Sequence, residues 1–201
     1  MTDTTDPTDH AFSPSVVAAQ VRKGSRAHYA GMILADRVDA RLAAFVGQVR
    51  SFYLASASAD GQPYVQHRGG PAGFLKVLDD KRLAFADFRG NLQYISTGNF
   101  AENPKAFIFL MDYANRRRIK IWGEAQVIEG DEALNEALMV PGYRAKVEQA
   151  IVFTITAWDI NCPQHIPQLV PAGEVAEMMA GRDARIAMLE AQLADLSKSG
   201  T

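Results

Sequence analysis

The stretch Ser51–Leu78, SFYLASASADGQPYVQHRGGPAGFLKVL, decides the fold class. Strand-like residues lie on both sides of Asp60 and Gly61, and an Asp-Gly pair between two such runs is typical of a β-hairpin. A third apolar run, residues 73–78, follows the glycine-bearing segment at 68–73. The stretch therefore predicts short strands joined by tight turns, the pattern of an antiparallel meander or barrel.

The rest of the chain continues this pattern in both directions. Ser13 and Pro14 predict a helix start, with Ser as N-cap and Pro in the first helical position. A helix is expected over Asp39–Val49, because its apolar residues fall on one face. The polar segment 90–104 predicts a short helix flanked by loops. Further strands are expected at residues 83–88, 105–112, 118–129 and 150–159, with helices at Asp131–Leu138 and Tyr143–Ala150.

The C-terminal segment has a different period. From Val175 its apolar positions advance in alternating steps of four and three residues, with Arg182 in one of them, as in a heptad repeat. The segment is either an amphipathic helix on its own domain or a helix that packs on a partner chain. We expect a disordered tail at 1–11, a flavin-binding split-barrel domain with N-terminal helices at 12–171, and a C-terminal amphipathic helix at 172–201.

Composition excludes several functional classes. The chain has 201 residues, 48% hydrophobic and 22% charged, as in a folded domain with a good core. Its formal net charge of −2 gives no basic field for nucleic acid. No apolar run is long enough to cross a membrane, and the acidic start does not resemble a secretory signal. A single cysteine, Cys162, fits a reducing compartment, so a cytoplasmic protein is expected.

Two interpretations are open for the segment that begins at Arg68. The planar guanidinium of Arg68 suits a phosphate, and Gly69, Gly70 and Gly73 would let backbone approach a flat ligand. A bulge or barrel corner would also require glycine here. Neither a Walker loop nor a dinucleotide-binding fingerprint is present.

Polar residues farther along the chain are candidate ligands of a phosphate or a ribityl chain. Asn91, Ser96 and Thr97 suit this role, because they flank an expected helix start; a capped, solvated loop is the alternative. Cys162 and His165 lack further ligands for a metal, so no metal site is predicted. No side chain stands out as a catalytic acid, base or nucleophile.

The order of these segments resembles the pyridoxamine 5'-phosphate oxidase-like family of FMN-binding split barrels. The resemblance covers roughly Phe45 to Gln164. It is carried by SFYLASASADGQPYVQHRGGPAGFLKVL, LAFADFRGNLQYISTGNFAENP, DYANRRRIKIWG and AWDINCPQHIP.

The resemblance implies a mainly β fold, a six-stranded antiparallel split β-barrel with flanking helices. It also implies a homodimer with FMN at the subunit interface. The resemblance would place the following residues at the flavin, the last two of them from the partner subunit: Arg68, Gly69, Gly70, Gly73, Phe74, Leu75, Lys76, Asp87, Phe88, Asn91, Ser96, Thr97, Arg118, Trp158 and Asn161.

The resemblance, together with the family segments that have no match in this chain, gives three hypotheses for the function. An FMN-dependent oxidoreductase acting on an unidentified small molecule is the leading hypothesis. The closing segment that holds substrate in the family's true oxidases has no match here, so the resemblance does not extend to pyridoxamine phosphate oxidation. A non-catalytic module for flavin or haem is the second hypothesis, and a dimeric scaffold with an empty barrel is the third.

Overall fold

The computed structural model describes residues 7–160 and 162–199. Two compact units divide the chain: the first comprises the chain up to Asp112 together with Arg117–Pro163, and the second Tyr113–Arg116 and the chain from Gln164 onward. The predicted domain ranges stay predictions. Along the chain the elements are η1 (Pro7–His10), α1 (Pro14–Lys23), α2 (Arg26–Tyr29), α3 (Ala40–Gln48), β1 (Ser51–Ala57), β2 (Pro63–Gly69), β3 (Leu75–Val77), β4 (Arg82–Phe88), α4 (Ile95–Glu102), β5 (Lys105–Asp112), β6 (Arg117–Ile128), α5 (Glu132–Leu138), β7 (Val147–Ile160) and α6 (Ala172–Ser199).

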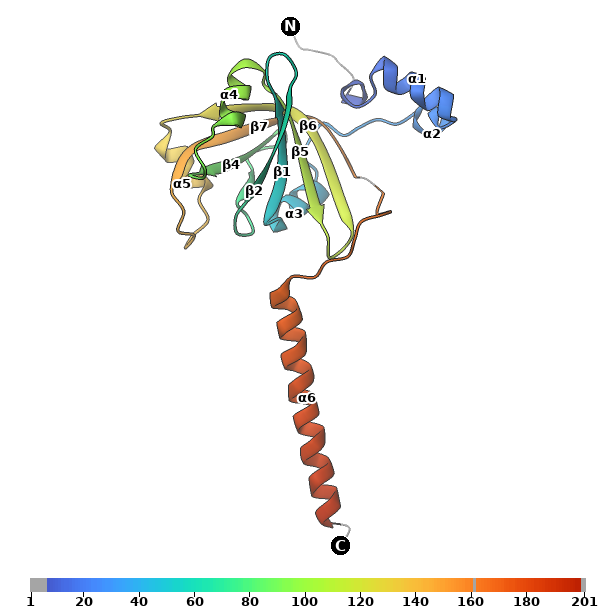
Figure 1. The fold of residues 1–201 in the computed structure, drawn as a ribbon, viewed down its shortest axis with the longest axis vertical. Coiled ribbons are helices and arrows are strands. Elements are labelled where there is room, and N and C mark those ends of the chain that lie inside the picture. The colour runs from blue at the N-terminus through green and yellow to red at the C-terminus, as the bar shows by residue number, and fades with distance from the viewer. Residues whose placement is uncertain (1–6, 161, 200–201) are drawn as a thin grey trace. The chain divides into compact units, whose positions relative to one another are not determined.

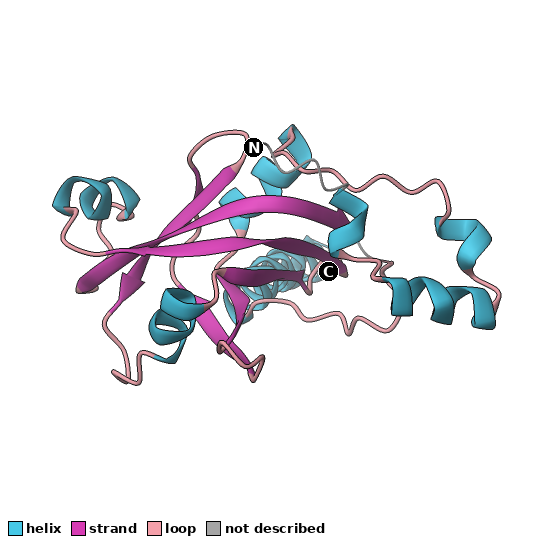
Figure 2. Ribbon diagram, turned by 90° about the horizontal axis from the view of Figure 1, so that it is seen from above, coloured by secondary structure: helices cyan, strands magenta, loops and turns pink. Residues whose placement is uncertain are grey.

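The first unit forms one curled antiparallel sheet with the helices α1 to α5 around it (Figure 1). The strand order is β2-β1-β5-β6-β7-β4-β3, so β2 and β3 are the two edges of the sheet. In the view from above, the strands cross one another at steep angles, as expected of a strongly twisted sheet (Figure 2). The expected fold class is confirmed, with seven strands in place of the six that the resemblance implies. The short β3, with three residues, pairs with β4 alone.

Local sequence signals explain the first half of the sheet. The carboxylate of Asp39 accepts a hydrogen bond from Leu42 N at 2.8 Å and begins α3, which buries Leu42, Phe45 and Val46. Asp60 and Gly61 lie in the turn between β1 and β2, and Gly61 has a φ of 90°. The predicted helix that begins after Asp39 and the predicted hairpin turn at Asp60 and Gly61 are both confirmed.

Two separate clusters of apolar side chains hold the sheet. The main core lies against one face and includes Phe52, Phe74, Phe85 and Phe153. A smaller cluster of alanines from β4 and β7 packs against Leu138 of α5. Because β4 contributes to both clusters, it is buried along most of its length.

The helix predicted at Tyr143–Ala150 is wrong, because β7 begins at Val147. Gly142, just before the predicted helix, has a φ of 79°, a left-handed conformation that does not occur inside a right-handed helix. Ala150 pairs with Ala86 of β4 and with Ile128 of β6. Pairing on both sides therefore outweighs the local helix signal.

The glycine-bearing segment after Arg68 carries the chain from one edge of the sheet to the other. β2 ends at Gly69 and the next strand, β3, pairs only with β4, at the opposite end of the strand order. Gly73 has a φ of 83°. A Cβ on Gly70 would lie 2.7 Å from the ring of Phe74. The crossing therefore needs glycine at both positions for structural reasons.

The second unit contains α6, which begins at Ala172. Before it, Gln168 Nε2 donates to Ala114 O at 2.9 Å, and Leu169 N donates to Tyr113 O at 3.4 Å. Every described residue of the helix from 172 to 196 is exposed. Among the described residues, no helix is long and apolar enough to span a membrane.

Candidate functional site

Arg68 of β2 forms an ion pair with Asp87 of β4, and both side chains are largely buried, at 13% and 11% exposure. The pair joins strands from opposite ends of the sheet order, so it lies across the opening of the split barrel. The Arg68 guanidinium also lies 5.7 Å from the centre of the Phe85 ring. Its Nε is buried and has no hydrogen-bond partner among the described residues. One strong donor at the opening is thus unused.

Gln149 links this ion pair to the start of α4. Its Nε2 donates to Asp87 Oδ2 and to Thr97 Oγ1, each at 2.9 Å. Ser96 Oγ donates to Gln66 Oε1 of β2 at 3.0 Å. Ser96 and Gln149 are 2% and 4% exposed, so these bonds are shielded from water. The network ties α4 to β2 and β7, and through Gln149 it continues to Asp87 of β4.

The loop between β4 and α4 is held in an unusual backbone conformation. Leu92 and Tyr94 have φ values of 61° and 50°, which non-glycine residues rarely adopt. Asn91 Oδ1 accepts a hydrogen bond from Gln93 N at 3.3 Å. Tyr94 is the N-cap of α4 and makes no side-chain capping bond. The first N–H groups of α4 therefore lack a side-chain cap, as in helix termini that bind anions.

These elements surround a small hollow of about 40 Å³. Small-molecule pockets usually measure roughly 300–1,000 Å³, so this hollow alone cannot enclose a flavin. The residues that line it are Gln66, Arg68, Asp87, Phe88, Gly90, Asn91, Leu92, Gln93, Tyr94, Ser96, Thr97 and Glu148.

Glu148 is the second carboxylate at this hollow. Tyr94 OH donates to its Oε1 at 3.4 Å, and Arg89 Nε lies 3.7 Å from the same oxygen. Since Asp87 is also paired, both carboxylates in the lining have partners. Hydroxyl and amide groups make up most of the remaining polar surface, a donor set that suits a phosphate or a ribityl chain.

Six of the predicted site residues meet at the hollow, and the others lie elsewhere. The six are Arg68, Asp87, Phe88, Asn91, Ser96 and Thr97. Outside the lining are Gly69, Gly70, Gly73, Phe74, Leu75, Lys76, Arg118 and Trp158; Asn161 lies outside the described residues.

Three of the residues outside the lining belong to the protein core. Phe74 and Leu75 are 2% and 1% exposed and pack in the main apolar cluster. Trp158 is 3% exposed, and its Nε1 donates to Arg37 O at 2.8 Å. Their predicted contacts with flavin stay predictions, and burial in the core is the role that the structure gives them.

Sequence reasoning missed the other residues at the hollow. Gln66 lies two residues before Arg68 on β2, and this spacing in a strand puts both side chains on one face. Glu148 of the lining, and Gln149 of the network beside it, were missed because a helix was predicted there. The remaining missed residues are Gly90, Leu92, Gln93 and Tyr94.

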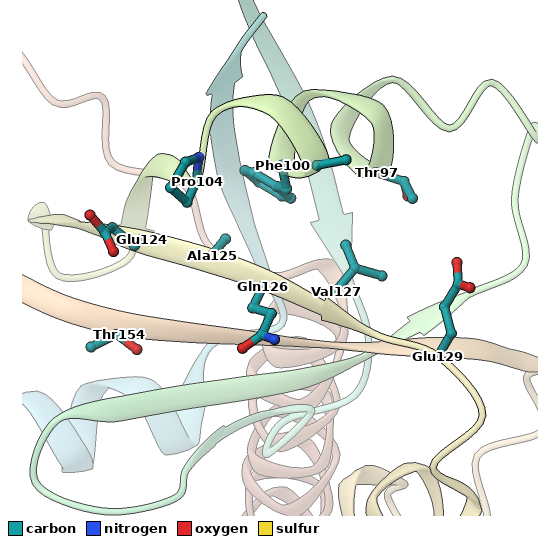
Figure 3. Close-up of a pocket in the computed structure, with 10 residues that line it drawn as sticks. Thr97, Phe100, Pro104, Glu124, Ala125, Gln126, Val127, Glu129 and Thr154 are labelled. Atoms are coloured by element: carbon teal, nitrogen blue, oxygen red, sulfur yellow. The ribbon is translucent and has the colours of Figure 1, made fainter. Parts of the chain in front are cut away.

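A larger hollow of about 540 Å³ lies between α4 and β6 (Figure 3). Phe100 and Pro104 face Ala125 and Val127 across it. Thr97 belongs to the lining of both hollows. The larger one has glutamates but no Lys or Arg in its lining, so the chemistry for an anion lies in the smaller one.

Metal ligands do not gather elsewhere in the described part of the chain. No three or more His, Cys, Asp or Glu side chains lie close enough there to hold a metal ion. Cys162 is a free, exposed thiol.

A model of the family described as pyridoxamine 5'-phosphate oxidase matches residues 38–162. The match covers more than half of the sequence, and the chain belongs to this family. It includes every strand of the sheet, the α4 loop and the network around Arg68. No curated protein gives a significant match.

Two solved structures are among those that resemble this chain. HupZ of Group A Streptococcus is 16% identical, with a TM-score of 0.50, over 66% of this chain and 99% of that chain. An FMN-binding protein from Syntrophomonas wolfei subsp. wolfei is 13% identical, with a TM-score of 0.48, over 73% and 97%. At these identities the similarity to HupZ shows the fold alone.

Proposed function

We propose that this chain is an FMN-binding oxidoreductase that acts on a small molecule. The proposal rests on three features that meet at one hollow. They are the Arg68 Nε, which has no partner among the described residues, the uncapped start of α4, and the side chains of Asn91, Ser96 and Thr97. The family that the chain belongs to supports the choice of a flavin phosphate as the ligand of this donor set.

The phosphate would lie at the small hollow. A phosphate of charge near −2 needs a cation and several N–H or O–H donors. Asp87 takes one terminal nitrogen of Arg68, which leaves Nε as a donor for a phosphate oxygen. Because Gln149 also donates to Asp87, that carboxylate is compensated on both oxygens and repels an incoming anion less.

The flavin ring would lie outside the hollow, against a second copy of the chain. A volume of about 40 Å³ leaves no room for a tricyclic ring within this hollow. We therefore place FMN at the interface of a homodimer, with the ring beside the backbone of Gly73–Lys76 and near Arg118. The proposal does not use Trp158, whose indole is already held by Arg37 O.

Flavin, when bound, supplies the hydride chemistry. The residues of this chain would bind the phosphate, orient the ring and exclude water from one of its faces. Both carboxylates at the hollow are paired, so we assign neither of them a role as acid or base.

Absorbance of the purified protein, followed by anaerobic reduction, tests the proposal. We expect flavin bands that persist through desalting, FMN as the released ligand, and bleaching of the bound flavin by NADH or NADPH. A protein that stays colourless after incubation with FMN would exclude the proposal.

A non-catalytic flavin-binding module is the second candidate function. The pairing of both Asp87 and Glu148 favours it, since neither carboxylate of the lining is left for proton transfer. This candidate predicts that FMN binds but stays oxidised with every hydride donor offered.

A further inference from the structure

The helix α6 carries an apolar seam, interrupted by Arg182, that is largely exposed to solvent. The seam runs in alternating steps of four and three residues, and its exposed fractions range from 41% for Val175 and Leu189 to 68% for Leu196. Its members, apart from Arg182, are Val175, Met179, Ile186, Leu189, Leu193 and Leu196.

A helix of this kind needs a partner for its stability. With 28 residues it is about 42 Å long, and isolated helices depend on packing of an apolar face to be stable in water. Steps of four and three are those of a coiled coil, in which each apolar side chain packs between four side chains of the facing helix. The shape of the seam therefore suits another helix with the same repeat.

We propose that α6 pairs with α6 of a second copy of this chain as a parallel, in-register coiled coil. The charged residues beside the seam favour a second α6 as the partner helix, and they favour a parallel arrangement of the two helices. Taking Met179, Ile186 and Leu193 as heptad position a, Arg185 falls at g, and Asp183 and Glu190 fall at e.

Opposite charges meet only when the two helices are parallel. In a parallel pair, a g residue faces the e residue five positions later on the other helix. Arg185 therefore faces Glu190 of the partner subunit, and symmetry gives two such ion pairs per dimer. In an antiparallel pair, e faces e and g faces g. In the antiparallel register that pairs Met179 with Leu196 and Ile186 with Leu189, Asp183 would face Glu190 of the partner subunit, which is repulsive, and Arg185 would face a neutral glutamine.

Arg182 is the one charged member of the seam. A single polar residue in a seam lowers the stability of a coiled coil and fixes its register. In the parallel pair each Arg182 lies beside position 183, an aspartate, of the other helix. With only three heptads and this cation, the pair is expected to be weak on its own and to add to any contact between the barrels.

Cysteine cross-linking in the full-length chain tests the direction. In a Cys162→Ser background, Val175→Cys places one thiol at the start of the seam, and Glu177→Cys places one on the opposite face as the matched control. A parallel, in-register pair brings the two thiols at 175 within disulfide reach. An antiparallel pair separates them by roughly 30 Å. We expect oxidised dimer from Val175→Cys and little from Glu177→Cys. Equal yields, or no dimer from Val175→Cys at any protein concentration, would overturn the proposal.

A charge exchange in the Val175→Cys chain tests the pairing itself. Arg185→Glu or Glu190→Arg alone sets like charges against each other and should slow cross-linking by about two- to tenfold. The double exchange should restore the original rate. Residues five apart do not face each other on one helix, so rescue would come from contact between chains. Unchanged rates in both single variants would contradict the pairing.

Discussion

Arg68 and Asp87 join the two open ends of the sheet through one buried ion pair. β2, which holds Arg68, is one edge of the sheet, and β4 is separated from the other edge only by the three residues of β3. In the described part of the chain no backbone ladder connects these ends, so side chains from β2, β4, β7 and α4 close the opening. Most of these side chains also line the hollow proposed for phosphate, so a phosphate bound there would contact residues that close the barrel.

Removal of either partner of this pair should destabilise the fold strongly. Arg68→Ala leaves the Asp87 carboxylate buried without its cation. Asp87→Ala leaves the Arg68 guanidinium buried without its carboxylate. Each change is expected to lower the free energy of unfolding by about 3–5 kcal/mol. Urea unfolding of the purified variants measures this effect.

The exposed pair of Arg82 and Asp79 provides the control for that prediction. Its side chains are 51% and 38% exposed, so solvent screens the two charges, and Arg82→Ala should leave the midpoint of urea unfolding nearly unchanged. Equal losses from Arg68→Ala and Arg82→Ala would show that the buried pair does not hold the barrel.

Asn91→Ala separates ligand binding from stability. Asn91 is exposed, and its described side-chain bonds go to Gln93 alone, so its removal should leave the melting temperature unchanged. Loss of one donor to a charged phosphate should weaken FMN binding about tenfold or more. Riboflavin, which lacks the phosphate, should bind the variant and the parent chain equally. A parallel loss of affinity for both ligands would place Asn91 away from the phosphate.

Gly123→Ala should damage the sheet at its bulge. The pairing of β6 with β7 shifts register between Trp122 and Gly123, and a Cβ on Gly123 would lie 2.2 Å from Thr154 O. We expect a loss of about 2 kcal/mol or more in unfolding free energy. Gly47→Ala in α3 is the matched control, because the added Cβ would meet open space. This substitution should stabilise the helix by roughly 0.5–1 kcal/mol.

The N-cap of α3 should give a measurable pH dependence. The Leu42 N–H holds the pKa of Asp39 below its ordinary value of 3.8, with a smaller effect from Arg41. A lowered pKa in the folded state means that the ionised cap stabilises the fold above pH 3.8 and loses this effect as pH falls through the folded pKa.

Asp39→Asn isolates this effect, since asparagine also caps helices but does not titrate. Thermal unfolding of the parent chain and this variant should differ at neutral pH and converge on acidification. Asp39→Ala should lower stability by about 0.5–2 kcal/mol at neutral pH. A gap between the parent chain and the Asp39→Asn variant that is constant with pH would contradict the prediction.

Local signals in the sequence were sufficient for the elements whose stability is local. Asp39 as a cap and Asp60-Gly61 as a hairpin turn act within a few residues, and both lie where they were predicted. The start of β7 could not be predicted in this way, because Ala150 is held by neighbours on β4 and β6.

The candidate site was predicted in part for the same physical reason. Arg68, Asn91, Ser96 and Thr97 stand out by residue type beside glycines or a helix start. The link from the Arg68–Asp87 pair to Thr97 runs through Gln149, which lies on a strand more than fifty residues away from Thr97 along the chain. The structural role of Gly70 depends on the position of the Phe74 ring, which no local pattern specifies.

Comparative titration of FMN and riboflavin into the purified protein tests the central claim most directly. The claim is that the donors around Arg68 hold a flavin phosphate. The account predicts that FMN binds at least about tenfold more tightly than riboflavin, because only FMN carries the phosphate. Equal affinities, or no binding of either flavin, would contradict it.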